Sequence, residues 1–398
     1  MIYADHAATT RLSPYALKAM MPFLTEEYGN ASSLYAPGRR ARRAVERARE
    51  AVAAAVGASP GEIYFTACGT ESDNWAIRAA AETNPDGLFA TTAVEHHAVL
   101  RTFEALRRAG RDTAVLGVDG CGRLSPETLR RAVRDGARGG SRTAFVSVMA
   151  ANNEVGTLMP LAELAEIAHG AGALFHTDAV QALGHIPLDV SELGLDMMSF
   201  SGHKFGGPKG VGGLYVRKGT PLPPGLYGGG QEHGLRSGTE NVAGIVGVAA
   251  ALTESCRGMR ETAARVAALR DRLIAGVLKL PGARLTGEPI RCQPDAGRQP
   301  DAGRQPGAGR LPGIASFVFD GVEGEALVLL LDQRGICASS GSACSAGALE
   351  PSHVLLAMGF SPEEARGELR LSLGPENTGE EVETILRVLP EVLQKLRA

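Results

Sequence analysis

Seven short apolar runs, rich in β-branched and aromatic residues, recur through the first half of the chain and predict strands. They are 62–66 (EIYFT), 87–92 (GLFATT), 113–118 (TAVLGV), 143–149 (TAFVSVM), 173–177 (ALFHT), 196–201 (DMMSFS) and 211–216 (VGGLYV). Ala-rich stretches with helical periodicity lie between several of them. This alternation is typical of an α/β domain with a mostly parallel sheet, which binds ligands at the carboxyl ends of its strands. We therefore expect the functional residues where these runs end.

Residues 38–57 (GRRARRAVERAREAVAAAVG) predict an amphipathic helix. One stripe of this helix is apolar and is formed by Ala41, Ala44, Val45, Ala48 and Val52. Its many arginines could form a docking patch, but a solvated helix face is the favoured interpretation.

The pattern changes after about residue 256. A long helical stretch (259–280) is followed by a β-like run (314–320), an apolar helical stretch (323–335) and a helix at the C-terminus. These elements predict a smaller α+β domain, to which the first dozen residues are added. The predicted division is thus a large domain of residues 13–255 and a small domain of residues 1–12 and 256–398.

Residues 293–310 contain three near-copies of a hexapeptide, QPDAGR, QPDAGR and QPGAGR. They are rich in Pro and Gly and have no apolar periodicity, so they predict a disordered surface loop. Three copies are too few for a solenoid. We interpret the segment as a low-complexity insertion that performs no chemistry.

Composition narrows the classes of function. The chain has 398 residues, of which 44% are hydrophobic and 21% charged, and its net charge is -3, so no nucleic-acid partner is predicted. The first residues do not resemble a signal peptide and no apolar run is long enough to span a membrane, which favours a cytoplasmic protein. The six cysteines are scattered, which predicts free thiols in a reducing compartment. No metal site is predicted, since no C-x-x-C pair occurs.

Two ends of apolar runs carry candidate catalytic groups. Lys204 lies in a Gly-rich turn (SGHKFGGPKG), and burial can deprotonate such a lysine so that it acts as a nucleophile. Lys209 lies in the same turn, and spacing does not decide between the two. Asp178 and Gln181 follow another run. Asp178 either caps the next helix or pairs with a heterocyclic nitrogen, as the cofactor pyridoxal phosphate requires.

Four further positions each have two interpretations. Thr70 begins a helix after a strand, where it either binds a phosphate or belongs to a plain N-cap. His96 either stacks on a planar cofactor and shuttles protons or is incidental. Asn152 and Asn153 follow a third run, and Arg370 either grips a carboxylate or forms a structural salt bridge. Taken together, these groups match pyridoxal phosphate chemistry on an amino acid.

Cys344 lies in residues 338–347 (ASSGSACSAG), where nearly every neighbour is Ser, Gly or Ala. Buried structural cysteines usually lie among apolar residues, whereas this sequence favours a turn or a mobile loop that displays the thiol.

Ten motifs in order resemble those of the cysteine desulfurases, fold type I pyridoxal phosphate enzymes of the class V aminotransferase family. The resemblance covers essentially the whole chain except the hexapeptide insertion. The motifs are ADHAATT, YGNASSLY, FTACGTESDN, VEHHAV, NNEVGT, HTDAVQALG, SGHKFGGPKGVGGLY, GGGQEHGLRSGTEN, SSGSACSAGALEPSHVLLAMG and RLSLG. The resemblance implies a large domain with a mostly parallel seven-stranded sheet and a smaller α+β domain. It also implies conversion of L-cysteine to L-alanine, with sulfur passed to an acceptor protein such as an iron–sulfur scaffold.

The resemblance assigns the chemistry to particular positions. It implies that Lys204 binds the cofactor covalently and removes the substrate Cα proton, and that Cys344 is the nucleophile that carries the persulfide. It implies further that Asp178 contacts the pyridinium nitrogen and Gln181 the phenolate oxygen. His96 would stack on the ring and act as acid and base.

Binding roles follow from the same resemblance. Asn153 would contact both cofactor and substrate, and Arg370 would bind the substrate carboxylate. Thr239 would reach the cofactor phosphate of the other subunit in a homodimer. Thr70, Ser201 and His203 would also hold the phosphate, and Gly69 is a further cofactor-binding residue.

Three positions depart from the commonest pattern of these enzymes. His6 stands where Asn or Tyr is frequent, Ala31 where Pro is frequent, and Cys68 lies in the phosphate turn. None of them removes a group that the chemistry requires.

Two rival functions remain. One is a selenocysteine lyase or aminotransferase of the same fold, and the other is a binding protein without turnover. The displayed thiol argues against an aminotransferase.

Overall fold

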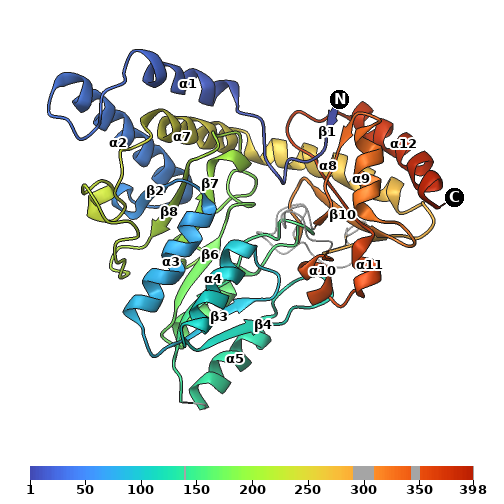
Figure 1. Ribbon diagram of the computed structural model, residues 1–398, viewed down its shortest axis with the longest axis horizontal. Helices are drawn as coiled ribbons and strands as arrows, with labels where there is room; N and C mark the ends of the chain where they lie inside the picture. Colours follow the sequence, from blue (N-terminus) through green and yellow to red (C-terminus); the bar gives the residue numbers. More distant parts are fainter. Residues whose placement is uncertain (139, 290–308, 342–349, 398) are drawn as a thin grey trace, which may run out of the picture.

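The computed structural model describes residues 1–138, 140–289, 309–341 and 350–397. Cys344 and most of the hexapeptide insertion lie outside the described residues. Two groups of elements are visible in Figure 1, a large sheet with its helices and a smaller group of strands and helices that contains both chain ends.

All seven predicted strands form, and they make one sheet. Their order is β2 (Ile63–Thr66), β8 (Gly212–Val216), β7 (Met197–Ser201), β6 (Leu174–Asp178), β5 (Thr143–Ser147), β3 (Leu88–Thr92) and β4 (Thr113–Leu116). β8 is antiparallel to both of its neighbours, and the other pairs are parallel. The predicted mostly parallel, seven-stranded sheet is confirmed.

Helices surround this sheet. They are α1 (Pro14–Thr25), α2 (Ala36–Val56), α3 (Gly69–Thr83), α4 (His97–Arg108), α5 (Pro126–Arg138), α6 (Leu161–Gly170) and α7 (Val242–Arg257), with short 3-10 turns η1 (Pro60–Glu62), η2 (Gly202–Lys204) and η3 (Glu232–Gly234). α1 and α2 pack against α7, and α3 packs against α4.

The apolar stripe predicted for residues 38–57 is buried on α2. The favoured interpretation of its arginines as a solvated face holds at every position except Arg49, which is buried. Arg49 departs from that face because its guanidinium pairs with the buried carboxylate of Glu232.

The second group of elements is built on an antiparallel sheet in the order β12 (Glu368–Ser372), β10 (Ile314–Phe319) and β9 (Ala283–Leu285). Its helices are α8 (Met259–Val277), α9 (Gly324–Asp332), α10 (His353–Ala357), α11 (Pro362–Arg366) and α12 (Gly379–Arg397). The N-terminal strand β1 (Ile2–Tyr3) pairs with β11 (Ile336–Cys337) in this group. The chain bends by 74° between α7 and α8. These pairings support the proposed division at residues 12 and 256.

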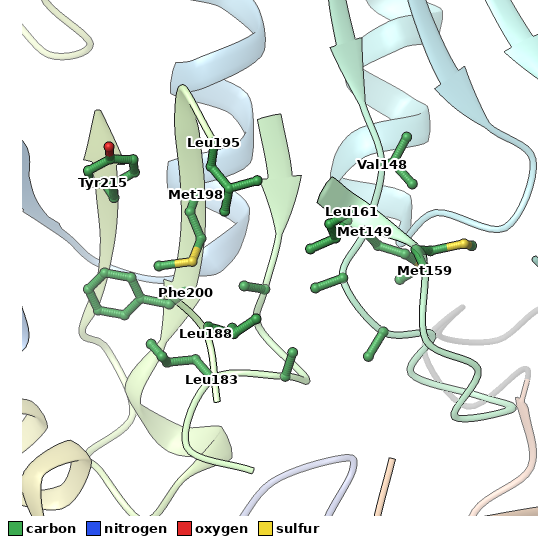
Figure 2. Packing of buried hydrophobic residues seen from close by; sticks show 14 of the residues in the cluster. Val148, Met149, Met159, Leu161, Leu183, Leu188, Leu195, Met198, Phe200 and Tyr215 are labelled. Atoms are coloured by element: carbon green, nitrogen blue, oxygen red, sulfur yellow. The ribbon is translucent and has the colours of Figure 1, made fainter. Parts of the chain in front are cut away.

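The core under the carboxyl ends of the central strands is densely packed. Figure 2 shows Met198 and Phe200 on β7 beside Tyr215 of β8. The Phe200 ring occupies the space above Gly213, where an added Cβ would lie 2.2 Å from a ring carbon. Burial of each such side chain stabilises the folded state by about 1.5–3 kcal/mol, so this packing holds the strand ends in place.

The end of the hexapeptide insertion corrects the prediction of a disordered loop over 293–310. Arg310, its last residue, is 4% exposed and forms an isolated bridge with Thr157. Its guanidinium donates to the carbonyl oxygens of Val155 at 2.7 Å and Glu288 at 2.9 Å. Arg310 is ordered because it satisfies carbonyl groups that would otherwise be buried without donors.

Within the described part of the chain, no single helix is both long and apolar enough to cross a membrane. Only α7 and α8 taken together meet that criterion, by length and composition and with the 74° bend between them.

Candidate active site

Asp178 and Lys204 follow neighbouring strands of the large sheet. Asp178 ends β6, is 5% exposed, and accepts a hydrogen bond of 2.8 Å from the Val180 N–H. Lys204 ends the 3-10 turn that follows β7. Burial raises the pKa of Asp178 to about 6, while the Lys204 charge acts in the opposite direction. The two side chains therefore interact electrostatically, with the acid still ionised at neutral pH.

The N-terminal segment holds Lys204 in place. The Lys204 ammonium donates to the carbonyl oxygens of Ala7 at 2.6 Å and Ala8 at 2.9 Å. Gln181 Nε2 donates to the same Ala7 oxygen at 2.8 Å. Lys209, the alternative left open by the sequence, is exposed. The structure thus brings Lys204, but not Lys209, beside Asp178 and Gln181.

His96 is the N-cap of α4. Its Nδ1 accepts a hydrogen bond of 3.1 Å from the Ala98 N–H, so the neutral ring carries its proton on Nε2. Burial, together with the charge of Lys204, lowers the pKa of His96 to about 4. His96 is consequently a neutral imidazole at pH 7 that shares its site with Lys204.

A cradle of small residues lies at the start of α3. The helix begins at Gly69, and its N-cap Cys68 makes no side-chain cap hydrogen bond. A Cβ added to Gly69 would lie 2.5 Å from Val180 Cγ2 and 3.6 Å from Ser201 Cβ. A Cβ at position 69 would therefore clash with Val180, which favours glycine, while the buried Ser201 would lie at ordinary van der Waals distance from it. Thr70, the next residue, is exposed.

His203 lies on the other side of the Lys204 turn. Its Nδ1 is 3.1 Å from the Thr9 hydroxyl, and its carbonyl oxygen accepts a hydrogen bond from the Thr10 N–H at 2.9 Å. Burial lowers the pKa of His203 to about 4, with Lys204 contributing in the same direction. A neutral His203 can donate a hydrogen bond from its free Nε2 position when Thr9 donates to Nδ1.

Arg370 reaches the site from β12 of the smaller sheet. It is 3% exposed, and its guanidinium donates to the carbonyl oxygen of Asn153 at 2.9 Å and to Asp5 at 3.0 Å. Its Nε has no hydrogen-bond partner among the described residues. Arg370 thus forms the structural salt bridge that the sequence allowed, and its binding of a carboxylate stays a prediction.

Two predicted residues are not brought into this cluster by the described structure. Thr239 is exposed on the connection between β8 and α7. Cys344 lies outside the described residues. Both were predicted to act across a distance, Thr239 in the other subunit and Cys344 between cofactor and acceptor.

Sequence reasoning missed a buried polar cluster behind Asp178. His176 is fully buried, and its ring lies 2.9 Å from both the Ser147 and the Ser199 hydroxyls and 3.7 Å from Asp73. Burial, together with the charge of Asp178, raises the pKa of Asp73 well above its usual value. Asp73 looked like an ordinary acid near the start of a helix, so no sequence signal marked it.

Glu71 was also missed, although it supports the cradle directly. It accepts the Ala67 N–H at 2.7 Å and pairs with Arg236 at 2.8 Å. Arg236 lies in the same connection as Thr239, so this ion pair ties that connection to the turn before α3. Glu71 lies three residues after Cys68, and this spacing indicates an acidic residue in the first turn of the helix. The sequence does not show that Arg236 is its partner.

The fold and this arrangement of residues define a class of protein, and comparison with known proteins agrees. The family model described as Aminotransferase class-V matches residues 2–385. The chain belongs to the class V aminotransferase family.

Within that family the similar proteins are cysteine desulfurases. The chain is 46% identical over 398 residues to "Cysteine desulfurase IscS" of Methanosarcina thermophila, with 100% of this chain and 93% of the relative covered. It is 47% identical over 401 residues to "Cysteine desulfurase" of Cereibacter sphaeroides, with 100% and 97% covered. A solved structure titled "NIFS-LIKE PROTEIN" superposes with a TM-score of 0.87 at 39% identity, covering 99% of both chains.

Proposed function

We propose that this enzyme is a cysteine desulfurase that converts L-cysteine to L-alanine and passes the sulfur on as a persulfide of Cys344. The observation that carries this proposal is the convergence of Asp178, Lys204 and His96 at the strand ends. Full-length similarity to cysteine desulfurases supports it. The presence of Cys344 in the sequence supports a desulfurase rather than an aminotransferase.

The residues of the site fit pyridoxal 5'-phosphate. A buried, ionised Asp178 suits a protonated ring nitrogen, and Lys204 is the amine for covalent attachment. Gly69, Thr70, Ser201 and His203 would hold the phosphate, because the start of α3 presents backbone N–H groups that favour an anion. When bound, this cofactor supplies an electron sink for the carbanion formed at the substrate Cα.

The residues of the chain would bind the substrate and move its protons. Arg370 and Asn153 bind the carboxylate, because a guanidinium and an amide offer several donors to its two oxygens. Lys204 takes the Cα proton, for which its amine must be deprotonated. The buried neutral His96 holds a proton on Nε2 that it can donate.

Sulfur transfer balances without an external oxidant. The thiolate of Cys344 attacks the substrate sulfur, forming an S–S bond while the substrate C–S bond breaks. The electron pair of that C–S bond stays on carbon, which is protonated to the methyl group of alanine. The products are alanine and one persulfide, so L-cysteine and the thiol of Cys344 are consumed and no other reactant is needed.

The test is mass spectrometry of the protein after addition of L-cysteine. We expect one added sulfur atom on Cys344 and one equivalent of alanine. The variant Cys344→Ala should keep the cofactor absorbance but form no persulfide, with Cys256→Ala as a matched control that behaves like the native protein. Normal sulfide release by Cys344→Ala would refute the proposal.

The choice between the two lysines has its own test. Lys204→Ala should lose the borohydride-sensitive chromophore, and Lys209→Ala should keep it. The reverse result would move the cofactor attachment to Lys209.

We also propose a homodimer and a protein acceptor of sulfur in the cytoplasm. Large apolar side chains are exposed along α1 and the turn after it, which supports an interface there; they are Tyr15, Leu17, Met21, Leu24, Tyr28, Leu34 and Tyr35. Thr239 is exposed, as a residue that completes another subunit's site must be. The four cysteines in the described residues are free thiols, as in a reducing compartment. Sedimentation of the holoenzyme as a monomer would contradict the homodimer.

A further inference from the structure

Two buried acids from opposite sheets lie beside one glycine. Glu154 follows Asn153 in the large sheet's loops, and Glu368 lies two residues before Arg370 on β12; they are 4% and 2% exposed. A Cβ added to Gly341 would lie 1.9 Å from Glu368 Oε2 and 2.7 Å from Glu154 Oε2. Because both oxygens approach this one point, the two carboxyl groups are immediate neighbours.

The pair lacks the positive charge that two buried carboxylates need. Arg370 is the cation that acts on both acids, and its guanidinium already binds Asp5 and the Asn153 carbonyl oxygen. Burial raises the pKa of Glu154 to about 7 and raises that of Glu368 well above its usual value, where the charge of Glu154 adds to the effect. Two adjacent carboxyl groups of this kind hold one proton between them.

The hydrogen bonds of the pair also fit a shared proton. Glu154 accepts a hydrogen bond from the Ser352 hydroxyl, and Glu368 Oε1 accepts one from the Ser316 hydroxyl at 3.2 Å. Glu368 Oε2 has no hydrogen-bond partner of good geometry among the described residues, although the Gly341 N–H favours its charged form. A proton between Glu368 and Glu154 would satisfy this buried oxygen.

The pair contacts both described flanks of residues 342–349. On one flank, Ser339 pairs with Arg370 through backbone hydrogen bonds of 3.1 and 2.7 Å, which places Gly341 opposite Glu368. On the other flank, Ser352 binds Glu154 and caps α10 through the Leu355 N–H at 3.2 Å. Glu154 and Glu368 thus connect Gly341 and Ser352 to Asn153 and Arg370, the residues proposed to bind the substrate carboxylate.

We propose that Glu154 and Glu368 share one proton at neutral pH and, in this state, position Gly341 and Ser352 relative to Asn153 and Arg370. They are positioning residues, since neither touches the substrate. Loss of the shared proton leaves two adjacent buried carboxylates, whose repulsion pushes the two sheets and the two flanks apart. This inference rests on the proposed function only in its kinetic test, which measures the rate of persulfide formation on Cys344.

The kinetic test compares single-turnover rates of persulfide formation on Cys344 across pH, using the holoenzyme. In the native protein and in the exposed control Glu363→Gln, the rate should fall at alkaline pH as the shared proton is lost, because burial and the charge of Glu154 raise the pKa of Glu368 well above its usual value. Glu368→Gln keeps a neutral partner for Glu154, so its rate relative to the native rate should rise several-fold between about pH 6 and about pH 9. An unchanged ratio would overturn the proposal.

A second measurement separates this inference from the proposed function. The difference between the infrared spectra of the native holoenzyme and of Glu368→Gln or Glu154→Gln at neutral pH should contain the band of a protonated carboxyl group, whereas the difference between the native enzyme and Glu363→Gln should not. Native-like cofactor absorbance shows that a variant is folded. Persistence of the same band in both buried variants would overturn the shared proton, whereas absence of persulfide in the native protein at every pH would refute the desulfurase function alone.

Discussion

The buried ion pair between Arg49 and Glu232 allows a quantitative prediction. Both side chains are nearly inaccessible, and two parallel hydrogen bonds of 2.8 Å join them. Glu232 also accepts the Phe65 N–H of β2 at 2.8 Å. The change Glu232→Gln leaves the Arg49 charge buried without a compensating carboxylate, its remaining acidic neighbour being Glu46 at 3.4 Å.

The expected loss of stability is about 3 kcal/mol. Breaking a buried pair by removing one partner costs about 3–5 kcal/mol, and the amide oxygen of glutamine retains one acceptor, which favours the lower value. The same change releases a strained segment, because Glu232 has φ 47° and His233 has φ 60° without being glycine. We therefore also expect greater mobility in the connection that carries Arg236 and Thr239.

The assay is urea unfolding of the holoenzyme at fixed protein and cofactor concentrations. The single tryptophan, Trp75, is a local reporter because its Nε1 donates to the Pro223 carbonyl oxygen at 2.9 Å in the same connection. Glu46→Gln, a change at an exposed partner of Arg49, is the control and should cost less than about 0.5 kcal/mol.

The double variant Arg49→Met with Glu232→Gln should recover much of the stability, since no unpaired charge remains. A loss below about 1 kcal/mol for Glu232→Gln would refute the reasoning, because it would mean that Arg49 is solvated or finds another carboxylate.

Four other outcomes follow from the site and the insertion. Asp178→Asn should bind the cofactor at least about tenfold more weakly in equilibrium dialysis, because the neutral amide cannot pair with a protonated ring nitrogen. Arg370→Lys should raise KM for L-cysteine by about tenfold or more, with cysteamine, which lacks the carboxylate, binding the holoenzyme unchanged in a spectral titration. Removal of residues 291–307 through a short Gly-Ser linker should leave persulfide formation unchanged. Arg310→Ala should cost about 2 kcal/mol in denaturant unfolding, because the carbonyl oxygens it binds lose their donor.

The sequence by itself determined the local elements and most candidate residues. Each apolar run became a strand because the side-chain pattern of a strand depends on neighbouring positions. Lys204, Asp178 and His96 could be recognised because each follows a run of this kind, at the edge where parallel strands present their loops.

Only the tertiary structure decided which charged groups are buried. Arg49 and Glu232 are 183 residues apart, and on the helical pattern Arg49 looks like any other arginine of α2. Glu154 and Glu368 likewise resemble solvated acids until two sheets bring them together at Gly341. The environment of a charge is set by partners distant in the chain, whereas helix and strand patterns repeat over a few residues. The strands and the two candidate lysines were therefore predictable, and the buried carboxyl pair beside Asn153 and Arg370 was not.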